Sequence, residues 1–132
     1  MAITPVKTLV ERANREITTH SPAEALSRQS AGGAVLVDIR DIRELDREGR
    51  VDGALHAPRG MLEFWFDPQS PYHKQVFAQE GREYILFCAA GWRSALATKA
   101  LRDMGFDNVA HIEGGFGALR ESGASINAGD KA

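Results

Sequence analysis

The stretch YILFCAAGWRS, residues 84–94, carries an apolar run directly into a cysteine and then into a turn that contains glycine. Its first four residues are aromatic or branched, which favours a β-strand. Apolar side chains then recur at helical spacing up to Met104, which predicts a helix over about residues 93–104. The segment therefore predicts a strand, a tight turn and a helix, with Cys88 at the carboxyl end of the strand.

Strands and helices alternate along the rest of the chain as well. Apolar runs at 34–38 and 109–112 predict buried parallel strands. Capping residues and glycine stops predict helices over 9–17, 21–29, 41–49 and 114–121, and shorter helical segments are expected at 61–66 and 72–79, with an extended segment at 53–58. The pattern indicates an α/β fold, with a mainly parallel central sheet flanked by helices on both faces.

The length of 132 residues fits one domain. We expect an N-terminal helical extension over residues 1–20, the domain itself over 21–123, and a flexible C-terminal tail over 124–132. The extension could serve as a lid, a brace or a contact surface.

Charge and composition narrow the classes of function. The net charge is −2, from 16 basic and 18 acidic residues, which is not the footprint of a nucleic-acid-binding domain. No apolar run reaches the length of a membrane span, and residues 1–19 do not resemble a secretion signal. The single cysteine, Cys88, cannot form an internal disulfide. We therefore expect a cytoplasmic protein whose thiol stays reduced, with no nucleic-acid or membrane partner.

The position of Cys88 suggests a reactive thiol. Ligands of open parallel sheets bind at the carboxyl edge of the strands, and backbone N–H groups at a helix start lack partners within the helix. Gly91 allows a tight backbone path, because glycine adopts positive φ without strain. Near helix N-termini or beside arginine, the pKa of a cysteine falls from about 8.5 to roughly 3.5–7.5. The alternative is a buried cysteine that acts only as a small hydrophobe, but such a residue has no need of Gly91, Arg93 and Ser94.

Residues 88–94 resemble the active-site loop of the rhodanese family. Two further segments strengthen the resemblance, which covers residues 21–123. The first is similar to the family's N-terminal signature and comprises Val37-Asp38-Ile39-Arg40, Glu44, Gly49, Gly53-Ala54 and Pro58. The second is similar to the family's final glycine-pair motif and comprises Glu113-Gly114-Gly115-Phe116.

The resemblance implies a sulfurtransferase in which Cys88 is the nucleophile. Cys88 would take sulfane sulfur from a small sulfur-containing anion such as thiosulfate and pass it to cyanide, a thiol or a protein thiol. No metal and no organic cofactor is implied. Arg93 would contact the anionic oxygens of the donor or tune the sulfur. The backbone amides that would cradle the anion are those of Ala89, Ala90, Gly91, Trp92, Arg93 and Ser94.

Other side chains near the predicted site have weaker indications. We expect Arg59 to help bind an anionic donor, and Phe64, Trp65 and Trp92 to form an apolar rim, although one or two of these aromatic residues would instead pack in the core. Asp38 and Arg40 are interpreted as a structural ion pair, and Glu44 as a helix cap or ion-pair partner. The four histidines have no metal-ligand spacing, and no histidine is clearly placed as a base for Cys88.

Two other functions remain open at this stage. Phosphatases and arsenate reductases of related fold use a Cys-x5-Arg loop, whereas Cys88 and Arg93 are separated by four residues, and no aspartate is evident as a general acid. A non-enzymatic persulfide carrier or partner-binding module would keep the same loop. The sequence leaves the sulfur donor, the acceptor and the oligomeric state open.

Overall fold

The computed structural model describes residues 2–128. No helix within this range is both long enough and apolar enough to cross a membrane. The helices are α1 (Val6–Glu16), α2 (Pro22–Ser30), α3 (Ile42–Glu48), α4 (Leu62–Phe66), α5 (Trp92–Asp103) and α6 (Gly115–Glu121). The strands are β1 (Thr18–His20), β2 (Ala34–Asp38), β3 (Arg50–Val51), β4 (Leu55–His56), β5 (Glu83–Phe87), β6 (Val109–Ile112) and β7 (Ile126–Asn127).

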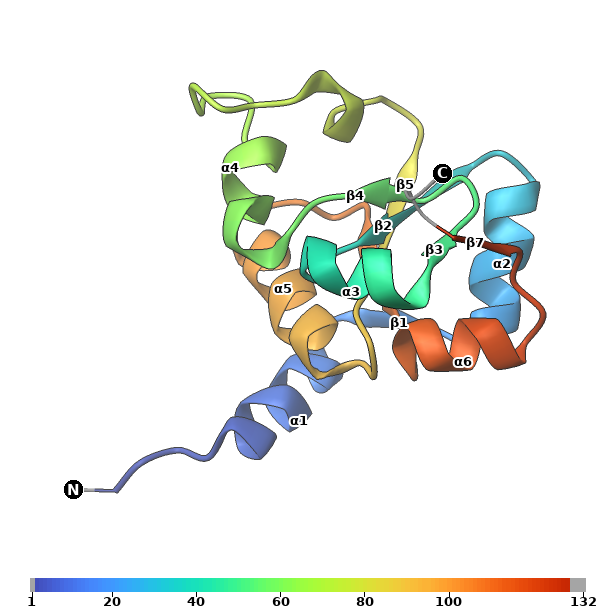
Figure 1. The fold of residues 1–132 in the computed structure, drawn as a ribbon. Coiled ribbons are helices and arrows are strands. Elements are labelled where there is room, and N and C mark those ends of the chain that lie inside the picture. Colours follow the sequence, from blue (N-terminus) through green and yellow to red (C-terminus); the bar gives the residue numbers. More distant parts are fainter. Residues whose placement is uncertain (1, 129–132) are drawn as a thin grey trace.

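Five of the strands form a parallel sheet in the order β1-β6-β5-β2-β4 (Figure 1). β5 lies at its centre, with Leu86 in register with Val37 of β2 and His111 of β6. The predicted α/β fold with a central parallel sheet is confirmed. The loop that follows β5 therefore begins in the middle of the carboxyl edge of the sheet.

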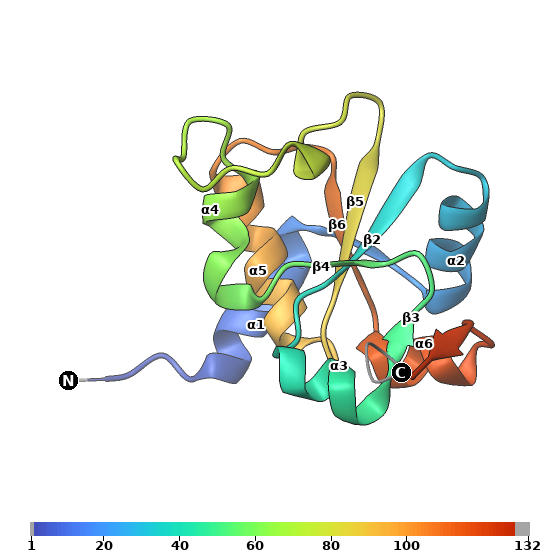
Figure 2. The ribbon, with the colours of Figure 1, turned by 45° about the horizontal axis from the view of Figure 1, so that its top comes forward.

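Helices cover both faces of the sheet, as Figure 2 shows. Tyr84 and Leu86 of β5 belong to the core cluster beneath α4 and α5, whereas Ile85 and Phe87 belong to the cluster beneath α2 and α6. All four side chains are fully buried. Burial on both faces explains why residues 84–87 of β5 form a continuous run of buried side chains, rather than an alternation of apolar and polar ones.

The N-terminal extension contributes a helix and an edge strand. Val10 and Ala13 of α1 pack against Ala95 of α5, and β1 pairs with β6 in parallel register. The sequence does not predict β1, because Thr18 and Thr19 are exposed polar residues without an apolar alternation. The described part of residues 1–20 is therefore attached to the domain through both elements, while residue 1 lies outside the described range.

The segment expected to be a flexible tail is partly folded. β7 pairs with β3 in an antiparallel ladder, with Ile126 opposite Val51. The Asp52 carboxylate accepts hydrogen bonds from the Ser125 hydroxyl and the Asn127 amide, which holds the segment in place. The expectation therefore differs from the structure over the described residues; positions 129–132 lie outside them.

The helix predicted over 72–79 is wrong for most of its length. Only a 3₁₀ turn, Gln75–Phe77, forms there. The buried Tyr84 hydroxyl donates to the Val76 carbonyl at 2.7 Å and accepts from the Gln79 amide at 3.0 Å. These bonds take the backbone groups that a longer helix would use for itself.

Candidate active site

Cys88 directly follows β5 and is almost completely buried. Its side chain is 1% exposed and belongs to the core cluster that contains Leu62 and Phe66 of α4. The residue is the single cysteine of the chain. The strand therefore places the thiol at the carboxyl edge of the sheet, as predicted, but beneath the surface of the loop.

The turn after Cys88 directs backbone N–H groups at the sulfur. Gly91 has φ +114°, a left-handed conformation that favours glycine, and α5 begins at the next residue. The amides of Gly91 and Ser94 donate to Cys88 Sγ, at 3.1 and 3.4 Å. Two of the six amides predicted for the cradle thus point at the sulfur itself.

The balance of burial and hydrogen bonding lowers the pKa of Cys88. Burial raises this pKa, since an anion loses hydration inside the protein. The Ser94 hydroxyl and the amides of Ser94, Gly91 and Ala90 lower the pKa and together outweigh burial. The net effect is a pKa below the ordinary value of the thiol, so the thiolate is a larger fraction than in a free cysteine.

The glycine pair before α6 supports the loop from behind. The amide of Phe116 donates to the Cys88 carbonyl at 2.7 Å, and the amide of Gly117 donates to the Ala89 carbonyl at 3.4 Å. Gly115 has φ +61°, and a Cβ at this position would overlap the Cys88 carbonyl oxygen. Because α6 binds the loop carbonyls on one side, the loop amides are free to face the sulfur on the other.

Arg93 forms an ion pair with Glu44. Its guanidinium donates to both oxygens of Glu44, at 2.8 and 3.1 Å. This pairing raises the pKa of Arg93 and lowers the pKa of Glu44, and the nearby Cys88 sulfur raises the pKa of Arg93 further. Glu44 also accepts from the Asp41 amide and so caps α3. The predicted cap and ion-pair roles of Glu44 are both present.

Of the other side chains predicted near the site, two form contacts elsewhere and two lie exposed on the surface. Arg59 forms an ion pair with Glu63 at 2.8 Å and does not line the pocket beside the loop. Trp65 packs against the core and under Lys74. Phe64 is 49% exposed and Trp92 is 52% exposed, so these two aromatic rings remain on the surface.

Asp38 and Arg40 form a buried structural pair. The Arg40 side chain is fully buried and donates to Asp38 at 2.7 Å and to the Gly49 carbonyl at 2.9 Å. Its guanidinium lies 4.0 Å from the centre of the Phe116 ring. These contacts connect β2 to α6 and to the end of α3, which agrees with a structural interpretation.

A pocket of about 440 Å³ lies beside the Cys88 loop, and we call it the carboxyl-edge pocket. Buried His111 contributes to its wall and accepts or donates a hydrogen bond at each ring nitrogen: Nδ1 lies 2.9 Å from Ser94 Oγ, and Nε2 lies 3.0 Å from Asn14 Oδ1. The sequence did not indicate His111 or Asn14, because they come from β6 and α1, far from the loop in the chain. The lining residues are Asn14, Thr19, Ala90, Gly91, Trp92, His111, Glu113 and Gly114.

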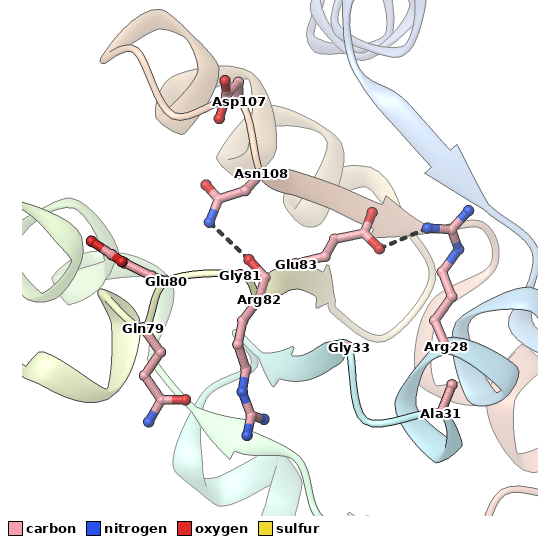
Figure 3. Close-up of a pocket in the computed structure, with 10 residues that line it drawn as sticks. All are labelled: Arg28, Ala31, Gly33, Gln79, Glu80, Gly81, Arg82, Glu83, Asp107 and Asn108. Atoms are coloured by element: carbon pink, nitrogen blue, oxygen red, sulfur yellow. Dashed lines mark hydrogen bonds and ion pairs between the residues drawn. The ribbon is translucent and has the colours of Figure 1, made fainter.

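A larger hollow of about 650 Å³ lies at the opposite, amino edge of the sheet, and we call it the amino-edge pocket (Figure 3). One of its acids is engaged in ion pairs: Glu83 binds Arg28 at 3.0 Å and His20, which lies outside the lining, at 2.8 Å. The Asn108 amide donates to the Arg82 carbonyl. Among residues 2–128, no three His, Cys, Asp or Glu side chains gather as a metal-ion site in either pocket or elsewhere.

Comparison with known proteins places this geometry in a family. The chain resembles a structure of a protein of unknown function from Rhodopseudomonas palustris, described as a possible tyrosine phosphatase, at 46% identity and a TM-score of 0.89, with 96% of this chain and 97% of that one covered. It also resembles a human single-domain sulfurtransferase, at 28% identity and a TM-score of 0.65, covering 78% of this chain and 95% of that one.

A third relative is much longer than this chain. A tRNA uridine(34) hydroxylase from Erwinia tasmaniensis is 34% identical over 83 residues, which are 62% of this chain and 22% of the relative. The chain thus corresponds to less than a quarter of the length of that protein. The model of the rhodanese-like domain matches residues 21–122, which include the Cys88 loop, Glu44 and the glycine pair, and the chain therefore belongs to the rhodanese-like domain family.

Proposed function

We propose that this domain transfers sulfane sulfur through a persulfide on Cys88. The thiolate attacks the outer sulfur of a donor such as thiosulfate, the S–S bond of the donor breaks, and sulfite leaves with the bonding electron pair. A thiol, cyanide or a protein thiol then attacks the outer persulfide sulfur. Cys88 leaves as a thiolate and is ready for another cycle.

The convergence of backbone amides on the buried sulfur is the observation that carries this proposal. Gly91 and Ser94 donate to Sγ, and the pKa of Cys88 is lowered despite burial. A thiolate is the species that attacks sulfur, and the amides that hold it would also hold a persulfide anion. A neutral, inert core thiol would not need several N–H donors directed at its sulfur.

Arg93 is proposed to receive the anionic end of the donor. Its partner Glu44 keeps the guanidinium extended beside the loop, and 43% of the Arg93 side chain is exposed. A donor with anionic oxygens would share or replace Glu44 as the bidentate partner. Arg59 pairs with Glu63, so it would have to exchange this acid for the donor before it could bind the donor's anionic oxygens.

A phosphatase is the second candidate, because the relative at 46% identity is described as a possible tyrosine phosphatase. A phosphatase loop must surround a whole phosphoryl group with free donors. Here the amides of Gly91 and Ser94 already approach Sγ, at 3.1 and 3.4 Å, and Arg93 follows Cys88 after four residues rather than five. These features favour a loop that binds a single transferred sulfur atom rather than a whole phosphoryl group.

A protein and a tRNA are two further candidate acceptors. The exposed rings of Trp92 and Phe64 favour a protein acceptor, for which Cys88 would act as a persulfide carrier. The similarity to tRNA uridine(34) hydroxylases brings tRNA into consideration as a substrate of a longer assembly, although the net charge of −2 supplies no general attraction to RNA.

Intact mass before and after incubation with thiosulfate tests the proposal. We expect wild type to gain the mass of one sulfur atom, to lose it on addition of cyanide, and Cys88→Ser to gain nothing. An unmodified wild type whose Cys88 is alkylated by iodoacetamide would overturn the thiosulfate donor. Hydrolysis of a phosphotyrosine analogue by that same sample would establish the phosphatase instead.

A further inference from the structure

A continuous chain of polar side chains leads from the buried sulfur to the surface. Cys88 Sγ lies 3.6 Å from Ser94 Oγ, Ser94 Oγ lies 2.9 Å from His111 Nδ1, and His111 Nε2 lies 3.0 Å from the Asn14 side chain. Ser94 is fully buried and His111 is 3% exposed, whereas Asn14 is on the exposed side of the carboxyl-edge pocket. The chain crosses three elements, α5, β6 and α1.

The Ser94 hydroxyl carries a single proton, so it can donate to one acceptor at a time. Three acceptors surround it: the Cys88 sulfur, His111 Nδ1 and the Gly91 carbonyl at 3.3 Å. When Cys88 is a thiol, its S–H can donate to Ser94 Oγ, and the hydroxyl is then free to donate to His111. When Cys88 is a thiolate, the hydroxyl is needed at the sulfur.

A neutral histidine fits either direction of this chain. Burial and the nearby charge of His20 lower the pKa of His111 to about 4, so its ring is neutral at pH 7, with one donor and one acceptor nitrogen. With the proton on Nε2, the ring donates to Asn14 Oδ1 and accepts from Ser94. With the proton on Nδ1, it donates to Ser94 and accepts from the Asn14 amide after that amide has rotated.

We propose that Ser94, His111 and Asn14 form a hydrogen-bond relay whose direction reverses when Cys88 ionises, which makes His111 and Asn14 positioning residues for the thiolate. The proton balance follows from the two states. In the thiol state the relay holds protons on Sγ, Ser94 Oγ and His111 Nε2. Ionisation moves the sulfur proton to Ser94 and the serine proton to His111 Nδ1, while the Nε2 proton leaves into the carboxyl-edge pocket.

Burial leaves Cys88 without water to accept its proton or to solvate its anion, and the relay supplies both functions. Cys88 is 1% exposed, so its proton has no direct way into bulk water, and the remaining anion needs a donor at each site that water would have filled. The charged or titratable groups around the relay are His20 of β1, Arg93 of α5 with its partner Glu44 of α3, and Glu113 at the pocket wall. The functional value of the relay rests on the proposed nucleophilic role of Cys88, but its hydrogen bonds do not depend on that role.

The first test follows the tautomer of His111 by NMR on protein labelled with ¹⁵N at histidine. We expect the proton on Nε2 at pH values below the pKa of Cys88 and on Nδ1 above it. A tautomer that is the same on both sides of the Cys88 titration would overturn the relay. This measurement uses the wild-type chain, so it does not depend on how a variant folds.

The second test measures the pH at which iodoacetamide alkylation of Cys88 reaches half its maximal rate. Asn14→Leu and His111→Phe should raise this midpoint by about half a unit, because each bond in a hydrogen-bond chain strengthens its neighbours by roughly 10–30%. Asn108→Leu removes the matching amide bond at the amino edge and should leave the midpoint unchanged. Midpoints equal to wild type in both relay variants would contradict the proposal.

These two readouts are independent of sulfur transfer. If thiosulfate leaves no persulfide on Cys88 while the tautomer still reverses, the proposed function fails and the relay stands. If the persulfide forms but neither the tautomer nor the alkylation midpoint responds, the relay fails and the proposed function stands.

Discussion

The two edges of the sheet carry hollows of opposite character. The amino-edge pocket is the larger, at about 650 Å³ against about 440 Å³, and it is rich in charge. Its acid Glu83 is already held by Arg28 and His20. At the carboxyl edge, amides converge on one sulfur atom. Strand direction accounts for the difference, because in a parallel sheet the strands end, and the helices that follow them begin, at the same edge.

Pocket volume is a poor guide to chemistry in this fold. A strand that ends one residue before Cys88 and a helix that begins at Trp92 leave N–H groups without helical partners, and two of these groups donate to the sulfur. The amino edge receives helix ends and turns instead. Four experiments test this contrast.

The largest expected effect is on activity. Cys88→Ser should reduce sulfur transfer from thiosulfate to cyanide by more than about a thousandfold, since loss of a covalent nucleophile typically costs this much or more. Arg82→Ala, which changes the amino-edge pocket, should stay within about twofold of wild type. Steady-state kinetics measure both variants, and similar losses at the two edges would refute the contrast.

The two edges should also differ in their tolerance of a methyl group. Gly115→Ala should lower the free energy of unfolding by about 2–4 kcal/mol, because its Cβ meets the Cys88 carbonyl at a positive φ. Gly33→Ala places its Cβ in open space without a positive φ, so it should be within about 1 kcal/mol of wild type. Urea denaturation compares them, and an equally tolerated Gly115→Ala would contradict the tight support of the loop by α6.

Acid should lower the stability of the fold, because the buried His111 at the carboxyl edge resists protonation. The folded pKa of His111 is about 4, below the ordinary 6.5, so the unfolded chain takes up the proton first as the pH falls. The stability present above pH 6.5 should therefore decrease by about 2–3 kcal/mol between pH 6.5 and 4. Urea denaturation of wild type and His111→Phe across this range isolates the effect, and parallel pH profiles would refute it.

The smallest expected effect is on the thiol itself. Ser94→Ala removes the hydroxyl but keeps the amide, and it should raise the pKa of Cys88 by about one unit, the usual worth of one hydrogen bond to a charged group. The rate of alkylation at pH 7 would then fall up to about tenfold. Gln79→Ala at the amino-edge pocket serves as the control and should leave the rate unchanged. An unchanged rate in Ser94→Ala would show that the amides alone hold the anion.

Local patterns explain which parts of the molecule the sequence predicts. Residues 84–94 contain strand formers, a cysteine and a glycine that alone in the loop has positive φ, so the strand, the turn and α5 were foreseeable. β1 was not, because it has only three residues and Thr18 and Thr19 are exposed, so the strand has no apolar run to mark it, although threonine favours strands. Likewise, Glu44 binds Arg93 and Asn14 binds His111 only after distant segments have come together.

The strand order also sets a sequence of assembly. β1 is the first strand of the chain, yet Thr18 pairs with Ala110, 92 positions later by subtraction. During synthesis the ribosome therefore releases Cys88 well before β6 can pair with β1 and bring Asn14 to His111. Contacts that join such distant positions form late, because closing a long loop costs entropy before the contact is gained. A nascent chain stopped before residue 109 would present its thiol without the strand that carries His111, and its reactivity would mature only when the last third of the polypeptide has folded.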